Sequence, residues 1–171
     1  METQHPFLQW YGGAIGFATS LLGCRESARD VVQQALYKSL SARRVPTDVA
    51  AQKVWFFKVV RNLCINGLHQ EQRFQRHVDA DALAASFVDT DESHERSERI
   101  AWVRQGLAKL TPEQREIVVL RDVNDLSYDD LAEVLGIERG TVMSRLHRAR
   151  MALRDHLIRL QTQSGGATYA N

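Results

Sequence analysis

Four polar side chains near the C-terminal end of the chain have types and a spacing suited to binding nucleic acid. Thr141, Ser144, Arg145 and Arg148 recur at i, i+3, i+4 and i+7, so an α-helix would place them on one face. A guanidinium group can bond bidentately to guanine O6 and N7 or hold a phosphate, and hydroxyls serve phosphates or base edges. This face therefore predicts contact with a DNA duplex, with the two arginines dominating the energy.

The surrounding residues indicate how that face would be positioned. An apolar stripe on the same helix would pack on a core, and it consists of Val142, Leu146, Ala149 and Leu153. A shorter helix is predicted just before it, because Ser127 and Asp130 form a capping-box pattern and Gly136 permits a sharp turn. Two short helices around a tight turn are typical of a helix-turn-helix whose second helix enters the major groove.

Charge supports this interpretation only when it is counted locally. The whole chain holds 22 basic and 21 acidic residues, so its net charge does not indicate nucleic acid. Residues 139–159 contain six arginines and one aspartate, whereas residues 113–133 contain seven acids and two arginines. A localised positive stripe attracts phosphate even on a neutral molecule. The alternative for residues 139–159 is an ordinary solvated basic helix. The acids of 113–133 are expected on a solvated helix face.

Catalytic and metal chemistry have no support in the sequence. It contains no glycine-rich phosphate loop, no nucleophile motif and no histidine–cysteine set with metal-ligand spacing, so we expect no enzyme, cofactor or metal site. Cys24 and Cys64 are expected to be buried, reduced thiols. No apolar run approaches the ~20 residues that span a bilayer, and residues 1–20 lack a signal-peptide pattern. These features predict a cytoplasmic protein with no direct membrane insertion.

The hydrophobic periodicity predicts an all-α fold of two small helical domains. Residues 1–73 would form the first domain, residues 74–99 a flexible acidic linker, residues 100–161 the second domain and residues 162–171 a disordered tail. Within these domains helices are expected over 7–22, 27–40, 52–72 and 112–122, with a loop over 41–50 and a further helix beginning near Ser93. Thr111 and Gln114 around Pro112 form a second capping-box pattern.

Three stretches of sequence resemble a known family. TPEQREIVVLRDVNDLSYDDLAEVLGIERGTVMSRLHRARMALR resembles region 4 of bacterial RNA polymerase sigma factors, and most of all the extracytoplasmic-function (ECF) group. ARDVVQQALYKSL and VWFFKVVRNLCINGLHQEQR resemble the polymerase-binding and −10-reading parts of region 2. The resemblance implies a factor that binds core RNA polymerase through its β′ coiled coil and β flap, recognises promoter DNA and directs strand opening and initiation.

The resemblance also implies roles for individual residues. Region 4 would read the −35 element as duplex through Arg139, Thr141, Ser144, Arg145 and Arg148. Region 2 would capture flipped bases of the −10 element through Lys58, Arg61, Asn62 and Asn66. Asn62 and Asn66 lie one helical turn apart, and their amides suit a Watson–Crick edge. Polymerase would bind Asp30, Gln33 and Gln34. Met143 departs from the family, which often has lysine there, so one phosphate contact would be missing.

Partners and alternatives follow from the same comparison. ECF factors are generally held inactive by an anti-sigma factor, so the resemblance implies such a partner here. The alternative function is a stand-alone helix-turn-helix regulator that binds duplex operator DNA without polymerase. Such a regulator would carry an α/β ligand-binding or phosphoacceptor domain, whereas residues 1–73 have an all-helical pattern.

Overall fold

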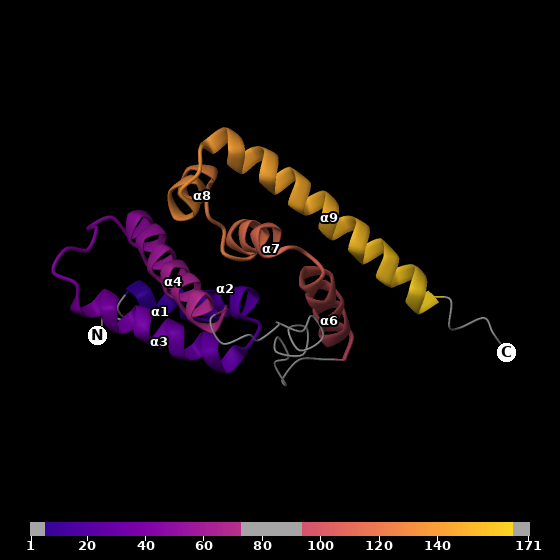
Figure 1. Cartoon of the computed structure of the whole chain (residues 1–171), viewed down its shortest axis with the longest axis horizontal. Helices are drawn as coiled ribbons and strands as arrows, with labels where there is room; N and C mark the ends of the chain where they lie inside the picture. The colour runs from indigo at the N-terminus through magenta and orange to yellow at the C-terminus, as the bar shows by residue number, and fades with distance from the viewer. Residues whose placement is uncertain (1–5, 73–93, 166–171) are drawn as a thin grey trace.

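The chain folds as two helical units, as the sequence predicts (Figure 1). A computed structural model describes residues 6–72 and 94–165, and its elements there are all helical. The N-terminal unit contains α1 (Pro6–Gln9), α2 (Tyr11–Leu22), α3 (Arg25–Ser41) and α4 (Val49–Gln72). The C-terminal unit contains α6 (His94–Ala108), α7 (Pro112–Val118), the π-helical turn η1 (Val119–Val123), α8 (Tyr128–Leu135) and α9 (Arg139–Gly165).

Several helix boundaries differ from the prediction for local reasons. The helix expected over 7–22 is interrupted at Trp10, although it ends at Leu22 as expected, where Gly23 follows with a φ of 72° that suits glycine. Helix α4 begins earlier than expected, at Val49, where the Asp48 carboxylate accepts a bond from the Ala51 N–H at 2.9 Å. Sequence periodicity does not resolve such end effects, because single side chains decide them.

The C-terminal unit departs from the prediction at two places. The helix expected over 112–122 widens into the π-helical turn η1, in which the backbone N–H and the side-chain amide of Asn124 both donate to the Val119 carbonyl at 3.1 Å. Helix α9 continues to Gly165, so the disordered tail expected from residue 162 is wrong for residues 162–165. Most of the acidic linker predicted for 74–99, and the last six residues of that tail, lie outside the described residues.

Aromatic side chains fill the core of the N-terminal unit. The Phe7 ring stacks on Phe56 with centroids 5.4 Å apart, and Phe17 meets Phe57 edge to face at 5.9 Å. Trp55 lies half-buried against Phe7, with centroids 5.9 Å apart, as a residue of the core. The wide aromatic residues of α4 therefore anchor this helix between α1 and α2.

Helix α9 is held along its length by two different contacts. Its first half buries the predicted stripe residues Val142, Leu146 and Ala149. Its second half packs on α6, where a side chain at Gly106 would come within 2.6 Å of Leu157 Cδ2. Figure 1 shows α9 extending well beyond α7 and α8 toward α6. The absence of a side chain at Gly106 permits this close helix crossing.

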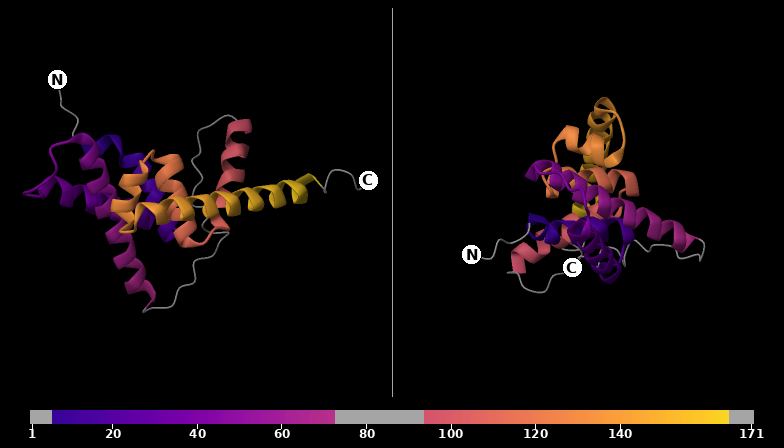
Figure 2. Two further views of the ribbon diagram at one scale, coloured as in Figure 1. Left: turned by 90° about the horizontal axis from the view of Figure 1, so that it is seen from above. Right: turned by 90° about the vertical axis from the view of Figure 1, so that its left-hand side faces the viewer.

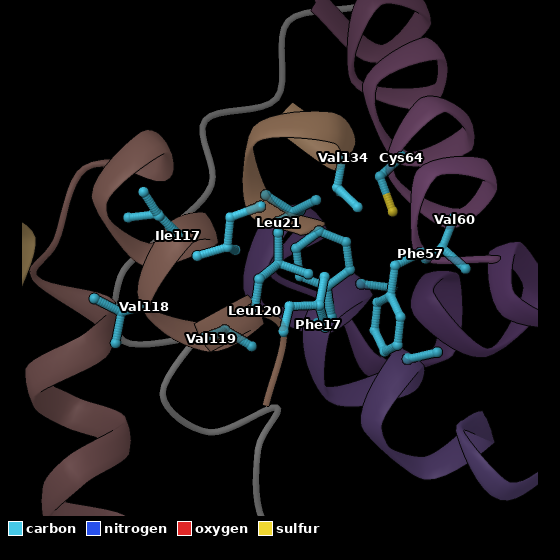
Figure 3. Close-up of a cluster of buried hydrophobic side chains, with 14 of the residues drawn as sticks. Phe17, Leu21, Phe57, Val60, Cys64, Ile117, Val118, Val119, Leu120 and Val134 are labelled. Carbon is cyan, nitrogen blue, oxygen red and sulfur yellow. The ribbon is translucent and has the colours of Figure 1, made fainter. Parts of the chain in front are cut away.

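The two units share one hydrophobic cluster instead of standing apart. Figure 3 shows α2 and α4 contributing Phe17, Leu21, Phe57, Val60 and Cys64, which face α7, η1 and α8. The opposing side chains include Ile117, Leu120 and Val134. Helix α8 contacts α4, and α7 contacts α2; Figure 2 shows the same close stacking from two further directions. Burial of this apolar surface favours the docked arrangement.

Arg115 joins the two units through backbone carbonyls. Its guanidinium is buried and donates to the carbonyls of Leu107 at 2.8 Å, Ala108 at 3.2 Å and Leu110 at 2.8 Å, all around the α6–α7 turn. A fourth bond, also 2.8 Å, reaches the Ser20 carbonyl on α2. Desolvation lowers the pKa of this arginine from its ordinary value. One side chain thus shapes a turn and fixes α2 beside it.

Candidate nucleic-acid interface

The helix-turn-helix forms with the local geometry that its sequence predicts. The Asp130 N–H donates to Ser127 Oγ at 3.1 Å, and the Ser127 N–H donates to Asp130 Oδ2 at 2.9 Å, which completes the capping box of α8. Gly136 turns the chain in the left-handed region at φ 66°, and the Ile137 N–H then bonds to the Ala132 carbonyl at 3.1 Å. Helix α9 follows at Arg139 with its direction fixed.

The predicted duplex-binding residues lie on the outer side of α9. Ser144, Arg145 and Arg148 are exposed, and Thr141 is half-buried. Arg148 Nε donates to the Ser144 carbonyl at 3.3 Å, a long bond that leaves most of the guanidinium's donors for a ligand. Arg139 lies at the start of α9 and pairs with Asp129 at 3.3 Å, with both side chains largely exposed. Such a surface pair is weak and a phosphate can displace it.

A hollow that the sequence did not reveal adjoins this face. It has a volume of about 330 Å³ and is lined by Glu113, Gln114, Arg145 and Arg148. The first two residues come from the start of α7, some thirty residues before the arginines, so periodicity along one helix could not show them. The hollow combines two guanidinium groups with an amide and a carboxylate, a polar setting that suits a phosphate or a base edge.

Arg150, the next basic residue of α9, is engaged within the unit. It forms a bidentate pair with Asp122 of η1, with Nη2–Oδ1 at 2.5 Å and Nε–Oδ2 at 3.1 Å. The bond to Asp122 raises the pKa of Arg150 from its ordinary value. This arginine holds α9 on η1, and its pairing separates it from the face formed by Arg145 and Arg148.

The candidate single-strand residues of α4 are divided between solvent and the C-terminal unit. Asn62 and Asn66 are exposed. Lys58 lies 3.8 Å from Glu133 of α8, and Arg61 Nε bonds to Glu116 Oε1 of α7 at 2.5 Å. The structure therefore presents the two amides to solvent and pairs the two cations with acids far away in the sequence.

Glu116 corrects the expectation that the acids of 113–133 lie on a solvated face. Its side chain is 10% exposed, and it faces Arg61 and Cys64 on α4. Burial raises the pKa of the Glu116 carboxyl from its ordinary value, although the bond from Arg61 and the charge of that guanidinium lower it. The other acids of the segment include exposed ones, such as Glu113 and Glu133.

Two further contacts between the units involve residues that the sequence did not single out. Lys53 Nζ on α4 donates to the Asn124 carbonyl at 2.5 Å. A Cβ atom at Gly13 on α2 would lie 2.2 Å from Asn124 Oδ1. Asn124 is buried at the end of η1 and so contacts both α2 and α4. Neither contact has a local sequence signal, because each depends on how the units dock.

The predicted polymerase-binding residues share an accessible face of α3. Asp30, Gln33 and Gln34 are exposed, while Val32 and Ala35 of the same helix are fully buried. The amphipathic pattern therefore places the three polar side chains where a partner can reach them.

The two cysteines differ, which corrects the expectation that both are buried. Cys24 is exposed just before α3, and hydrogen bonds with Ser27 lower the pKa of its thiol. Cys64 is buried beside Val134, where desolvation raises its pKa to about 12 (Figure 3). Among the described residues no cluster of three His, Cys, Asp or Glu side chains could hold a metal ion. The same part of the chain contains no helix long and apolar enough to span a membrane.

Comparison with known proteins places this geometry in a family. Residues 7–74 match the profile described as Sigma-70 region 2, and residues 100–153 match Sigma-70, region 4. The ECF RNA polymerase sigma factor EcfG of Rhodopseudomonas palustris (strain TIE-1) is 31% identical over 80% of this chain and 75% of its own length. The chain belongs to the ECF group of the sigma-70 family.

Other relatives support the same family. The ECF RNA polymerase sigma factor SigE of Mycolicibacterium smegmatis is 31% identical over 86% of this chain, which spans 58% of that protein. A solved structure of the sigma factor RpoE in complex with the anti-sigma factor NepR from Bartonella quintana superposes with a TM-score of 0.65. It has 25% identity and covers 88% of this chain and 92% of that one. Sigma factors are transcription initiation factors without enzymatic activity.

Proposed function

We propose that this ECF factor binds core RNA polymerase and directs it to promoters by reading two elements with two surfaces. The observation that carries the proposal is the presence of both surfaces in one chain. Region 4 has the helix-turn-helix with arginines on its outer face, and region 2 has the exposed amides of α4. A protein that acts on polymerase in this way would work in the cytoplasm.

Recognition of the −35 element is assigned to α9. The outer face offers Arg139, Thr141, Ser144, Arg145 and Arg148. Arg145 and Arg148 lie beside the hollow at the start of α7, so one arginine can reach a base edge while the other holds phosphate. Buried Val142 and Leu146 hold this face at a fixed angle.

Capture of the −10 element is assigned to α4. Asn62 and Asn66 would pair with the Watson–Crick edges of bases flipped out of the duplex, because an amide offers both donor and acceptor. Lys58 and Arg61 would hold the phosphates of the same strand. Asp30, Gln33 and Gln34 of α3 would meet the β′ coiled coil, and region 4 would meet the β flap.

An anti-sigma factor is proposed as a second partner. The structural relative RpoE is in complex with the anti-sigma factor NepR, and its likeness extends over most of both chains. Such a partner would compete with polymerase or promoter DNA for this factor.

The test is initiation by purified core polymerase on genomic DNA fragments, with and without this protein. We expect transcripts that depend on the protein and that Arg145→Ala/Arg148→Ala loses. Arg154→Ala/Arg159→Ala removes the same charge from the same helix and should retain them. Asn62→Ala/Asn66→Ala should still bind the −35 duplex but fail to open the promoter. Duplex binding with no polymerase association would favour the stand-alone regulator and reject the proposal.

A further inference from the structure

We propose that the docked arrangement is autoinhibited, because acids of region 4 occupy the cations of region 2 that would hold the −10 strand. The inference rests on the proposed function of α4. It concerns Lys58 and Arg61 on one side of the interface and Glu133 and Glu116 on the other.

In the contact between Arg61 and Glu116, the carboxylate occupies the guanidinium donors that a DNA phosphate would use. Arg61 Nε lies 2.5 Å from Glu116 Oε1, and Nη2 lies 3.4 Å from Oε2, so both oxygens of a planar anion face the guanidinium fork. Lys58 lies one helical turn earlier on α4 and faces Glu133 at 3.8 Å. A DNA strand needs the same two cations. The largely buried Arg61–Glu116 pair excludes the strand from Arg61, whereas the exposed Lys58–Glu133 pair is weaker and only competes with it.

The acids reach these positions because the shared hydrophobic cluster holds region 4 against region 2. Leu120 and Val134 face Phe17 and Phe57 in the shared cluster of Figure 3. Beside this cluster, Arg115 of α7 donates a hydrogen bond to the Ser20 carbonyl of α2. Apolar burial is not directional and does not by itself select which polar groups meet. The placement of the acids opposite Lys58 and Arg61 therefore determines that docking covers these two cations of α4.

Gly13 and Asn124 set how closely the units approach. Both heavy atoms that a Cβ atom at Gly13 would meet belong to Asn124, at 2.2 Å and 3.4 Å. A Cβ atom at position 13 thus clashes with the opposite unit only. Its neighbour Gly12 on α2 has open space around the same position. Gly13→Val should therefore push the units apart unless the Asn124 side chain moves aside, and Gly12→Val is its matched control.

Binding of a single strand then requires separation of the units. If the docked form outnumbers the open form about ten to one, the apparent affinity for the strand falls about tenfold. Any partner that holds the two units apart would remove this deficit. Asn62 and Asn66 remain exposed in the docked form. Docking of the units therefore blocks the phosphate contacts of α4 and leaves its two amides accessible.

The first experiment separates the units by steric clash. Full-length wild type, Gly13→Val and Gly12→Val would be titrated onto a fluorescein-labelled single-stranded DNA of about 15 nucleotides and followed by anisotropy. Gly13→Val should bind about tenfold more tightly than the other two. Cys64 reports the separation directly, because region 4 helps to bury it. In a Cys24→Ser background its alkylation should accelerate in Gly13→Val alone.

The second experiment removes the acids. Glu116→Ala/Glu133→Ala should gain affinity for the same strand, and adding Lys58→Ala/Arg61→Ala should abolish the gain. Glu138→Ala/Asp155→Ala is the matched control, since it removes two exposed acids of the C-terminal unit that pair with no described residue of α4. If Gly13→Val leaves Cys64 protected, the interface tolerates the side chain and the acid variants decide alone.

The outcomes distinguish this inference from the proposed function. The autoinhibition would be rejected if a variant with separated units bound the strand no more tightly than the wild type. It would also be rejected if Glu138→Ala/Asp155→Ala gained as much strand affinity as Glu116→Ala/Glu133→Ala. Initiation by the wild type with core polymerase would persist in that case. If the wild type with core polymerase produced no transcripts, the proposed function would be rejected instead.

Discussion

The Arg61 guanidinium on α4 is bonded to the Glu116 carboxylate on α7, fifty-five residues later in the chain, with Nε and Oε1 2.5 Å apart. The two side chains are 22% and 10% exposed. Removal of one partner from such a buried pair is costly, because the other charge is left unpaired. The contact therefore connects the stability of the docked form to the availability of a cation proposed to bind DNA.

The first prediction concerns the pH dependence of this pair. Burial raises the pKa of Glu116, so the folded state binds this proton more tightly than the unfolded state. The stabilisation from the protonated carboxyl is complete below the unfolded pKa of about 4.3 and is lost as the pH rises through the higher folded pKa. Unfolding free energies of the wild type and Glu116→Gln should therefore diverge as the pH rises from the unfolded pKa to the folded pKa, with the wild type losing relative stability across that window. Parallel pH profiles would contradict the prediction. Because Gln keeps an acceptor oxygen for Arg61, the units should stay docked.

The second prediction concerns the buried arginine at the α6–α7 turn. Arg115→Met would remove one donor from each of four carbonyls, including that of Ser20 across the interface. We expect a loss on the order of 3 kcal/mol in the free energy of unfolding, measured by urea titration. Arg121→Met is the matched control, because Arg121 donates to a single carbonyl, that of Leu126, and lies over the Tyr128 ring, and its loss should cost about 1 kcal/mol. Equal losses would show that the carbonyl cluster around Arg115 contributes nothing special.

The third prediction concerns the departure from the family at Met143. This side chain is 55% exposed on α9, beside the proposed duplex-binding residues. Met143→Lys should tighten binding to duplex DNA and make the slope of log K against log salt steeper by about 1, since one more phosphate would be neutralised. Met151→Lys places the same charge further along α9, where the side chain is 41% exposed. If Met151→Lys raised the affinity for duplex DNA as much as Met143→Lys does, the effect would come from added positive charge on the helix and not from a phosphate contact specific to position 143.

The fourth prediction concerns the two thiols. Cys24 is exposed and its pKa is lowered by hydrogen bonds with Ser27, whereas burial raises the pKa of Cys64 to about 12. The thiolate is the nucleophile, so iodoacetamide at pH 8 should modify Cys24 quickly and Cys64 only slowly. Mass spectrometry of labelled peptides over time would measure both rates. Comparable rates in the native protein would show that the interface around Cys64 opens readily.

The sequence alone determined the features that depend on neighbours along the chain. The capping boxes at Thr111 and Ser127 formed as predicted, because each joins residues three apart within one turn. Gly136 ended α8 in the left-handed conformation, and Val142 and Leu146 turned inward as their spacing required. The helical periods and the three stretches that resemble sigma factors also sufficed to predict the family.

The tertiary structure decided which of these surfaces are accessible. Glu116 and Glu133 belong to the same acidic segment, yet Glu116 is buried against Arg61 and Glu133 remains exposed beside Lys58. The approach of Gly13 to Asn124 likewise has no local pattern. Each depends on apolar surfaces that are far apart in sequence and bury one another only when the two units dock. Charge and periodicity describe the faces of a helix, whereas the packing of other helices decides what those faces meet.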